Sequence, residues 1–188
     1  MFIQTEQTPN PQTLKFLPGK VVMDEGTAFY QNIDEAGDSP FARRLFAIEG
    51  VEGVFFGSDF ITITKNDSYE WQIIKPSLLG GIMDHFNSGD KTVEKETVKD
   101  SINSLQKNDN DSDVVKQIKE LLDTRVRPAV AMDGGDIIYN DFEDGIVYLK
   151  MQGACSGCPS STATLKMGIE NMLKHYIPEV QEVRPVDV

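Results

Sequence analysis

The stretch DGGDIIYNDFEDGIVYLKMQGACSGCPSSTATLKMGIENMLKHYI, residues 133–177, decides the fold of the second half of this chain of 188 residues. Gly134 and Gly135 predict a tight turn into a strand. Two apolar runs flank the turn signal EDG, residues 143–145, which predicts two strands joined by a short turn. The last part is predicted to be a helix, because apolar residues share one helical face: Leu165, Ile169, Met172, Leu173 and Tyr176.

Two further elements flank this stretch. Residues 113–128, DVVKQIKELLDTRVRP, predict an amphipathic helix, and residues 179–186, EVQEVRPV, predict a last strand. The order α-β-β-α-β predicts a small sheet with helices packed on it. In this arrangement a strand–helix–strand crossover carries both cysteines at its turn. We expect residues 113–188 to form this C-terminal domain.

Residues 1–87 predict a second small domain of mixed helix and sheet. One helix has a clear start, with Ser39 as N-cap and Pro40 as the first helical residue. Pro76 is expected to start or kink a second helix. The predicted elements are strands at 1–7 and 13–23, helices at 39–50 and 68–86, and a hairpin at 51–65. The fold class is therefore α+β, in two small domains.

Residues 88–112 separate the two predicted domains. Their four aliphatic residues are Val93, Val98, Ile102 and Leu105, and the rest are charged, small or polar. The last three aliphatic residues lie at helical spacing, so we expect a short, marginal helix there. So polar a stretch has little apolar surface to bury. We predict a flexible linker that enforces no single arrangement of the domains.

The charge of the chain restricts its partners. With 18 basic against 30 acidic residues, the formal net charge is -12. Such a surface repels phosphate backbones and anionic membranes, so we expect neither nucleic acid nor a membrane as partner. The first residues, MFIQTEQTPNPQ, lack the features of a secretory signal or a transit peptide. We predict a soluble protein of a reducing compartment, most simply the bacterial cytoplasm, or the mitochondrial matrix for a mature eukaryotic form.

The two cysteines of the chain, Cys155 and Cys158, follow the second strand of the quoted stretch. They lie between a strand that ends near Gly153 and a helix that begins at 159–161. Unpaired N–H groups at a helix N-terminus stabilise a thiolate. The pKa of cysteines in such a position can fall from ~8.5 to roughly 3.5–7.5. The neighbouring residues are small, so the motif predicts thiolates that bind an inorganic group or react.

Four functions fit two neighbouring thiols: an inert structural pair, a thioredoxin-like dithiol, a zinc site and an iron–sulfur cluster. Zinc takes four ligands, and the two histidines, His85 and His175, are both expected at solvated or boundary positions. A cluster typically takes four cysteines, which two chains paired about a two-fold axis would supply. A cluster held at such a junction is easy to release, which suits a carrier.

Three segments resemble a known family. MDGGDI, residues 132–137, and GACSGCPSSTATLKMGIENMLK, residues 153–174, resemble the C-terminal NifU-type domain of Nfu iron–sulfur cluster proteins. IQTEQTPNPQTLKFLPGK, residues 3–20, resembles their N-terminal domain. The resemblance implies a scaffold or carrier that shares a 4Fe–4S cluster between two chains, with Cys155 and Cys158 as ligands. The expected partners are a second copy of the chain, upstream cluster-assembly proteins and apo iron–sulfur acceptor proteins, and whether a 2Fe–2S form precedes the 4Fe–4S cluster is left open.

The rest of the sequence predicts no catalysis. It contains no G-x-x-x-x-G-K-S/T phosphate loop, no H-E-x-x-H and no G-x-S-x-G motif. The chain is therefore predicted not to be an enzyme. The alternative from another class is a dithiol–disulfide oxidoreductase that acts through Cys155 and Cys158 as a metal-free monomer.

Overall fold

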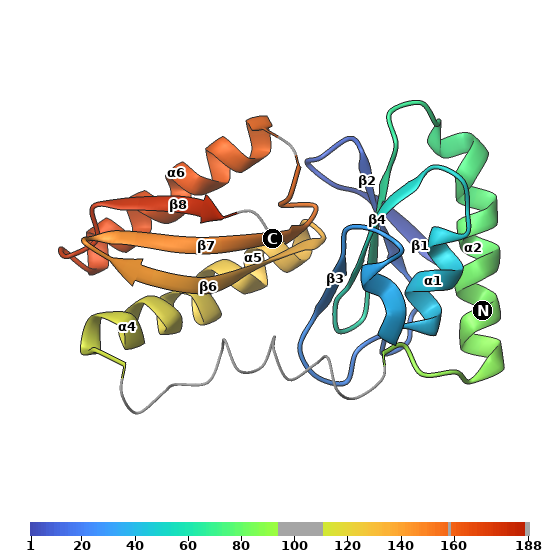
Figure 1. Ribbon diagram of the computed structural model, residues 1–188, viewed down its shortest axis with the longest axis horizontal. Coiled ribbons are helices and arrows are strands. Elements are labelled where there is room, and N and C mark those ends of the chain that lie inside the picture. Colours follow the sequence, from blue (N-terminus) through green and yellow to red (C-terminus); the bar gives the residue numbers. More distant parts are fainter. Residues whose placement is uncertain (94–110, 158, 187–188) are drawn as a thin grey trace.

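The computed structural model describes residues 1–93, 111–157 and 159–186. Figure 1 shows two parts, each with its own sheet and helices, which confirms the predicted α+β class with two domains. Residues 94–110, which include the predicted marginal helix and most of the predicted linker, lie outside the described residues. The exact domain boundaries stay a prediction.

The N-terminal domain has a sheet of five described strands in the order β1-β2-β5-β4-β3, with every neighbouring pair antiparallel. β2 ends earlier than predicted, because Pro18 has no N–H for the ladder and Gly19 turns the chain with φ 68°. The sequence analysis missed β3, a short edge strand. The strands are β1 (Gln4–Gln7), β2 (Thr13–Leu17), β3 (Ala28–Tyr30), β4 (Val51–Phe56) and β5 (Ile61–Lys65).

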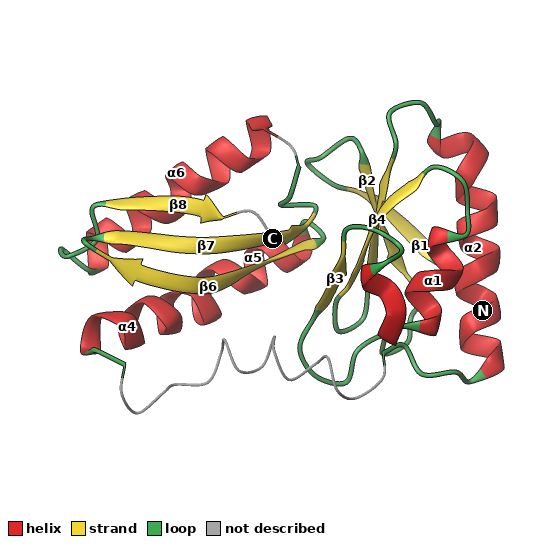
Figure 2. Cartoon of the chain, viewed as in Figure 1, coloured by secondary structure: helices red, strands yellow, loops and turns green. Residues whose placement is uncertain are grey.

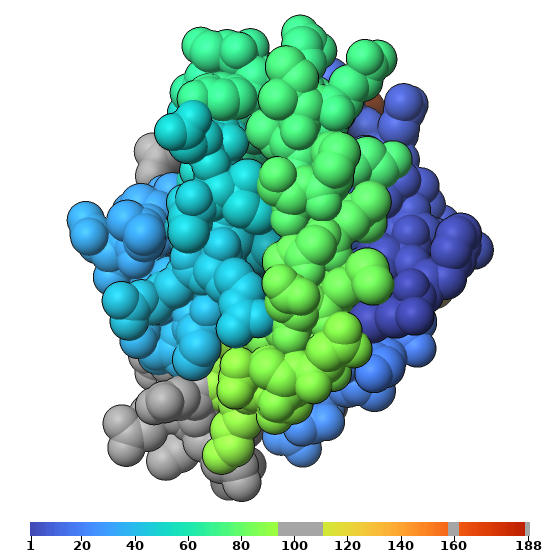
Figure 3. Space-filling model, turned by 90° about the vertical axis from the view of Figure 1, so that its right-hand side faces the viewer, coloured from blue at the N-terminus to red at the C-terminus, as the bar shows by residue number. Residues whose placement is uncertain are grey.

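Two α-helices and a 3₁₀ turn complete this domain: α1 (Pro40–Phe46), α2 (Trp71–Ser88) and η1 (Glu35–Asp38). Ser39 is the N-cap of α1, as predicted, and its hydroxyl oxygen accepts from the Ala42 N–H at 3.0 Å. Pro76 lies inside α2 rather than at its start. The two α-helices cover one face of the sheet (Figures 1 and 2), and Figure 3 looks directly onto this helical face.

Alternation along the strands divides the N-terminal sheet into two faces. The core beneath α1 and α2 contains Phe16, Val54, Phe56, Ile61 and Ile63. Residues between these positions point to the opposite face, and they are buried as well: Lys15, Phe55 and Thr62 are 7%, 1% and 1% exposed. The edge of the C-terminal domain that carries Cys155 covers this second face.

The C-terminal domain has three described strands in the order β6-β7-β8. β6 and β7 are antiparallel, while β7 and β8 are parallel, so the chain between β7 and β8 is the predicted strand–helix–strand crossover. The hairpin turns at Asp144 and Gly145, both with positive φ, as the EDG signal predicts. The elements are α4 (Asp113–Leu121), η2 (Leu122–Val126), α5 (Arg127–Met132), β6 (Gly135–Glu143), β7 (Ile146–Gly153), α6 (Pro159–Tyr176) and β8 (Glu182–Val186).

The first helical segment of this domain differs from the single helix predicted over residues 113–128. A π-helical turn, η2, separates α4 from α5, and α5 continues to Met132. Pro128 stands at the start of α5. Because proline removes a backbone donor and its ring clashes with the carbonyl four residues earlier, the hydrogen-bond register changes just before it.

The two domains are in contact in this structure. Hydrogen bonds join Thr62 to Gly134 and Asn10 to Ser156, across the predicted linker. None of the helices in the described ranges is long and apolar enough to span a membrane.

Candidate functional site

Cys155 lies just after the end of β7, in the loop that leads to α6, as the sequence predicts. Gly153 turns the chain out of the strand with φ 62°, and the Cys155 N–H donates to the Gln152 carbonyl at 3.3 Å. The Thr162 hydroxyl, in the first turn of α6, donates to the Cys155 carbonyl at 3.2 Å. We call residues 153–157 the cysteine loop. Cys158 lies outside the described residues.

The cysteine loop packs against the Gly134–Gly135 turn that precedes β6. Gly134 has φ 85°, and its carbonyl accepts from the Ala154 N–H at 3.2 Å. A Cβ atom on Gly135 would lie 2.5 Å from the Cys155 sulfur, well inside van der Waals contact. The predicted tight turn is therefore present. In addition, only a glycine at position 135 leaves room for the cysteine sulfur against the backbone.

The Cys155 thiol faces inward in this structure. The residue is 5% exposed and packs with the core of the C-terminal domain. Burial, followed by the charges of Asp133 and Asp136, raises the pKa of Cys155 to about 12. In this conformation the pKa is raised rather than lowered, because loss of hydration outweighs any stabilisation from the start of α6 at Pro159. In this conformation Cys155 is a neutral thiol.

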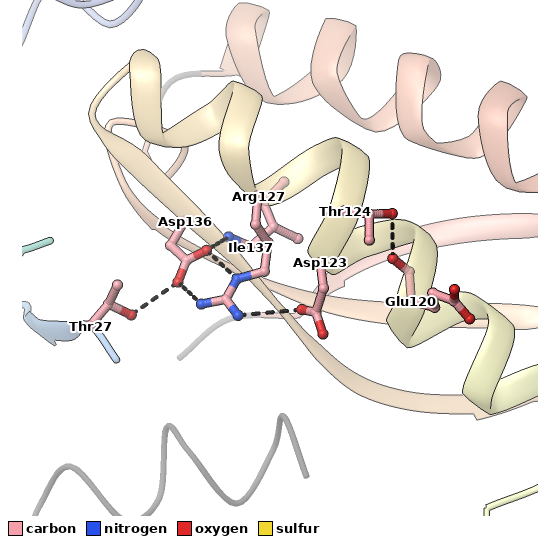
Figure 4. A network of polar contacts seen from close by, with 7 residues as sticks. All are labelled: Thr27, Glu120, Asp123, Thr124, Arg127, Asp136 and Ile137. Carbon is pink, nitrogen blue, oxygen red and sulfur yellow. Dashed lines mark hydrogen bonds and ion pairs between the residues drawn. The ribbon is translucent and has the colours of Figure 1, made fainter. Parts of the chain in front are cut away.

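Asp136 anchors the glycine turn through a network of polar contacts (Figure 4). Its carboxylate accepts from Arg127 Nε and Nη2, both at 2.8 Å, in a two-pronged ion pair. It also accepts from the Ile137 N–H at 2.8 Å and from the Thr27 hydroxyl at 2.9 Å. Arg127 in turn contacts Asp123 at 3.3 Å. The pair joins the start of α5 to the start of β6 and so fixes the turn beneath Cys155.

The two histidines lie away from Cys155. His85, expected at a solvated or boundary position, is instead 2% exposed and stacks on Phe41 with ring centroids 3.7 Å apart. The expectation was wrong because α2 turns this side chain towards α1. His175 is exposed on α6, as expected. Within the described ranges, no group of three or more His, Cys, Asp or Glu residues could hold a metal ion.

The sequence analysis missed the part of the N-terminal domain that borders the site. Asn10 Nδ2 donates to the Ser156 carbonyl at 3.2 Å, and the Thr62 hydroxyl donates to the Gly134 carbonyl at 2.6 Å. The only signal in the sequence was the alternation ITIT in residues 61–64, which places threonines on one face of β5. Alternation of this kind is equally typical of a strand with one face in water.

The fold and the site together define a thiol-bearing α+β domain joined to a second α+β domain. Two family models match the chain: "Scaffold protein Nfu/NifU N terminal" over residues 3–89 and "NifU-like domain" over residues 118–184. A human protein, "NFU1 iron-sulfur cluster scaffold homolog, mitochondrial", is 54% identical over 187 residues, which are 99% of this chain and 72% of the relative. The chain belongs to the Nfu family.

A plant relative agrees with this assignment. "NifU-like protein 4, mitochondrial" from Arabidopsis thaliana is 53% identical over 97% of this chain, which spans 65% of the length of that relative. The solution NMR structure of a NifU-like protein from Saccharomyces cerevisiae is 30% identical, with a TM-score of 0.47, and covers 51% of this chain and 87% of its own.

Proposed function

We propose that this chain is an iron–sulfur cluster scaffold and carrier that holds a 4Fe–4S cluster between two chains and transfers it to apo-proteins. The main support is the number of thiols. The chain has two cysteines, whereas such a cluster typically takes four. Two chains that pair their cysteine motifs about a two-fold axis supply Cys155 and Cys158 twice. The name of the human relative, which calls it an iron–sulfur cluster scaffold, supports the same role.

The cluster is cargo in this proposal, and the residues of the loop act on it in order. Cys155 first leaves its contact with Gly135 and loses its proton to solvent, because a thiolate is the ligand form. Gly153 and Gly157, with φ 62° and 80°, flank the cysteine and allow the loop to rearrange. Cys158 supplies the second thiolate of each chain. A 2Fe–2S form is the proposed intermediate during loading.

The partners and compartment follow from this role. A homodimer forms through the cluster, upstream cluster-assembly proteins supply it, and apo iron–sulfur proteins receive it. Close relatives carry the word "mitochondrial" in their names. That supports the mitochondrial matrix over the bacterial cytoplasm as the compartment of this chain.

Anaerobic native mass spectrometry after reconstitution with iron and sulfide tests the proposal. We expect a dimer that carries the mass of one 4Fe–4S unit, and loss of both cluster and dimer in Cys155→Ala and in Cys158→Ala. Ser156→Ala is the matched control, because it changes the same loop without removing a thiol. A monomer that binds no iron and loses about 2 Da on oxidation would establish a redox dithiol instead.

The dithiol alternative has less support from the geometry. A redox dithiol attacks as a thiolate, so its attacking cysteine works best with a pKa near the ambient pH. Cys155 is buried, and its pKa is raised to about 12. A metal-free chain in this conformation is therefore a poor disulfide reductant, and we expect no reduction of a small disulfide substrate above the rate of the Cys155→Ala variant.

A further inference from the structure

The N-terminal sheet has a buried face that its own helices do not cover. Lys15, Phe55 and Thr62 lie opposite α1 and α2 and are almost completely buried. The covering surface is the end of the C-terminal domain where the glycine turn and the cysteine loop meet (Figure 1). We call the residues on the N-terminal domain that make this contact the docking face: Asn10, Lys15, Thr27, Phe55 and Thr62.

One half of the contact holds the glycine turn. The Thr62 hydroxyl donates to the Gly134 carbonyl at 2.6 Å. Lys15 Nζ donates to the carbonyls of Ala131 and Met132 at 3.2 and 3.1 Å, at the end of α5. The last carbonyls of a helix have no partner within the helix and carry partial negative charge, so an ammonium group is a favourable partner for them.

The other half of the contact holds the cysteine loop. The Phe55 ring lies against Gly153, where a Cβ atom would come within 3.0 Å of its Cγ atom. Asn10 donates to the Ser156 carbonyl at 3.2 Å. These contacts fall two residues before Cys155 and one residue after it. They therefore bracket the one cysteine of the described residues without touching its sulfur, which faces the core of its own domain.

We propose that the docking face is a binding surface for the cysteine loop of its own chain. Docking fixes the backbone on both sides of Cys155 and so keeps the metal-free loop in the form with the thiol inward. The loop backbone engaged by Asn10 and Phe55 is then unavailable to a second chain. It follows, on the basis of the function proposed above, that docking competes with the pairing of two loops around a cluster.

The docking face gives the N-terminal domain a part in the function proposed above. Most of its polar groups donate to backbone carbonyls rather than to side chains. The bond from Asn10 depends on the position of the Ser156 carbonyl, so it is lost when the loop rearranges to present Cys155, while the bonds from Lys15 and Thr62 hold the end of α5 and the glycine turn. The docking face thus favours the metal-free loop, and binding of cargo shifts the equilibrium towards the undocked chain.

Thiol alkylation of the metal-free chain tests the docking. In a Cys158→Ser background Cys155 is the sole thiol, and N-ethylmaleimide reports how often it becomes accessible. Thr62→Arg places a long charged side chain in the contact and is expected to accelerate alkylation about tenfold. Gln4→Arg adds the same charge at an exposed position of β1 and is expected to leave the rate unchanged. Fluorescence of Trp71, the one tryptophan, checks that the N-terminal domain remains folded.

Equal rates in all three proteins, or equal acceleration by both substitutions, would overturn the docking inference. If Thr62→Arg does not fold, Lys15→Met removes two of the interdomain hydrogen bonds with little change in volume and takes its place.

A second experiment, with both cysteines present, measures the rate of cluster loading, which Thr62→Arg should increase. Failure of the parent chain to load a cluster would sink the proposed function and leave the alkylation result intact. If the parent chain loads a cluster but Thr62→Arg leaves the alkylation rate unchanged, the docking inference is overturned and the proposed function stands.

Discussion

Gly135 is the residue whose substitution most directly probes the contact with Cys155. Gly135→Ala would place its Cβ atom 2.5 Å from the sulfur and 2.8 Å from the Gln152 carbonyl oxygen. Because backbone and core must shift to relieve this overlap, we expect the free energy of unfolding of the C-terminal domain to fall by about 1–3 kcal/mol. Urea unfolding followed by far-UV circular dichroism measures the change.

Gly168 in α6 offers a matched control for that substitution. An added Cβ atom at Gly168 meets no described heavy atom within 4 Å. Gly168→Ala should therefore stabilise the helix by up to about 1 kcal/mol, through helix propensity alone. Similar losses of stability at both glycines would show that the contact with Cys155 is not the cause.

His85 makes the stability of the N-terminal domain depend on pH. Burial, followed by the charge of Arg44, lowers the pKa of His85 from 6.5 to about 4. The unfolded chain therefore binds a proton at a higher pH than the folded chain. The stability contributed by neutral His85 is complete above pH 6.5 and is lost as the pH falls towards 4, by up to about 3 kcal/mol.

Urea unfolding followed by Trp71 fluorescence at pH 4 to 7 tests this dependence. His85→Phe preserves stacking on Phe41 and removes the titrating group. Other groups titrate over the same interval, so the informative quantity is the difference between parent and variant. We expect the parent to lose stability relative to His85→Phe as the pH falls. A constant difference would contradict the shifted pKa.

Among the elements, α5 and β6 depend on one ion pair for their relative position. Asp136→Asn leaves Arg127 without its buried carboxylate partner. Breaking such a pair from one side costs about 3 kcal/mol, so we expect a loss of that size in the unfolding free energy. Asp123→Asn removes the exposed partner of the same arginine, and its expected cost is below about 1 kcal/mol. Urea unfolding of both variants makes the comparison, and equal effects would contradict the assigned role of Asp136.

Element prediction succeeded where a local signal was strong and failed where two signals competed. The Ser39 cap, the EDG turn and the apolar period of α6 were each sufficient to locate an element. The helix predicted over 113–128 failed in detail, because its apolar period continues through Pro128 while the proline breaks the hydrogen-bond register. β3 was missed because three residues are too few to show a period of two.

At the scale of the molecule, the docking face predicts that the metal-free chain is compact. Lys15→Glu would place a carboxylate against the carbonyls that end α5, and should separate the domains. We expect its radius of gyration in small-angle X-ray scattering to exceed that of the parent. Lys75→Glu makes the same charge change at a lysine that bonds to Thr5 of its own domain, so it should not expand the chain. Equal scattering from all three proteins would contradict a docked arrangement.

The sequence by itself determined the class of fold, the order of elements around the cysteines and the position of the motif between β7 and α6. These features depend on turn chemistry and apolar period within short segments, which the residues express locally. Only the tertiary structure decided that Cys155 is a buried neutral thiol and that the N-terminal sheet docks on its loop. Both depend on residues far apart in the chain, such as Thr62 and Gly134, whose contact arises when separate backbones pack together and expel water.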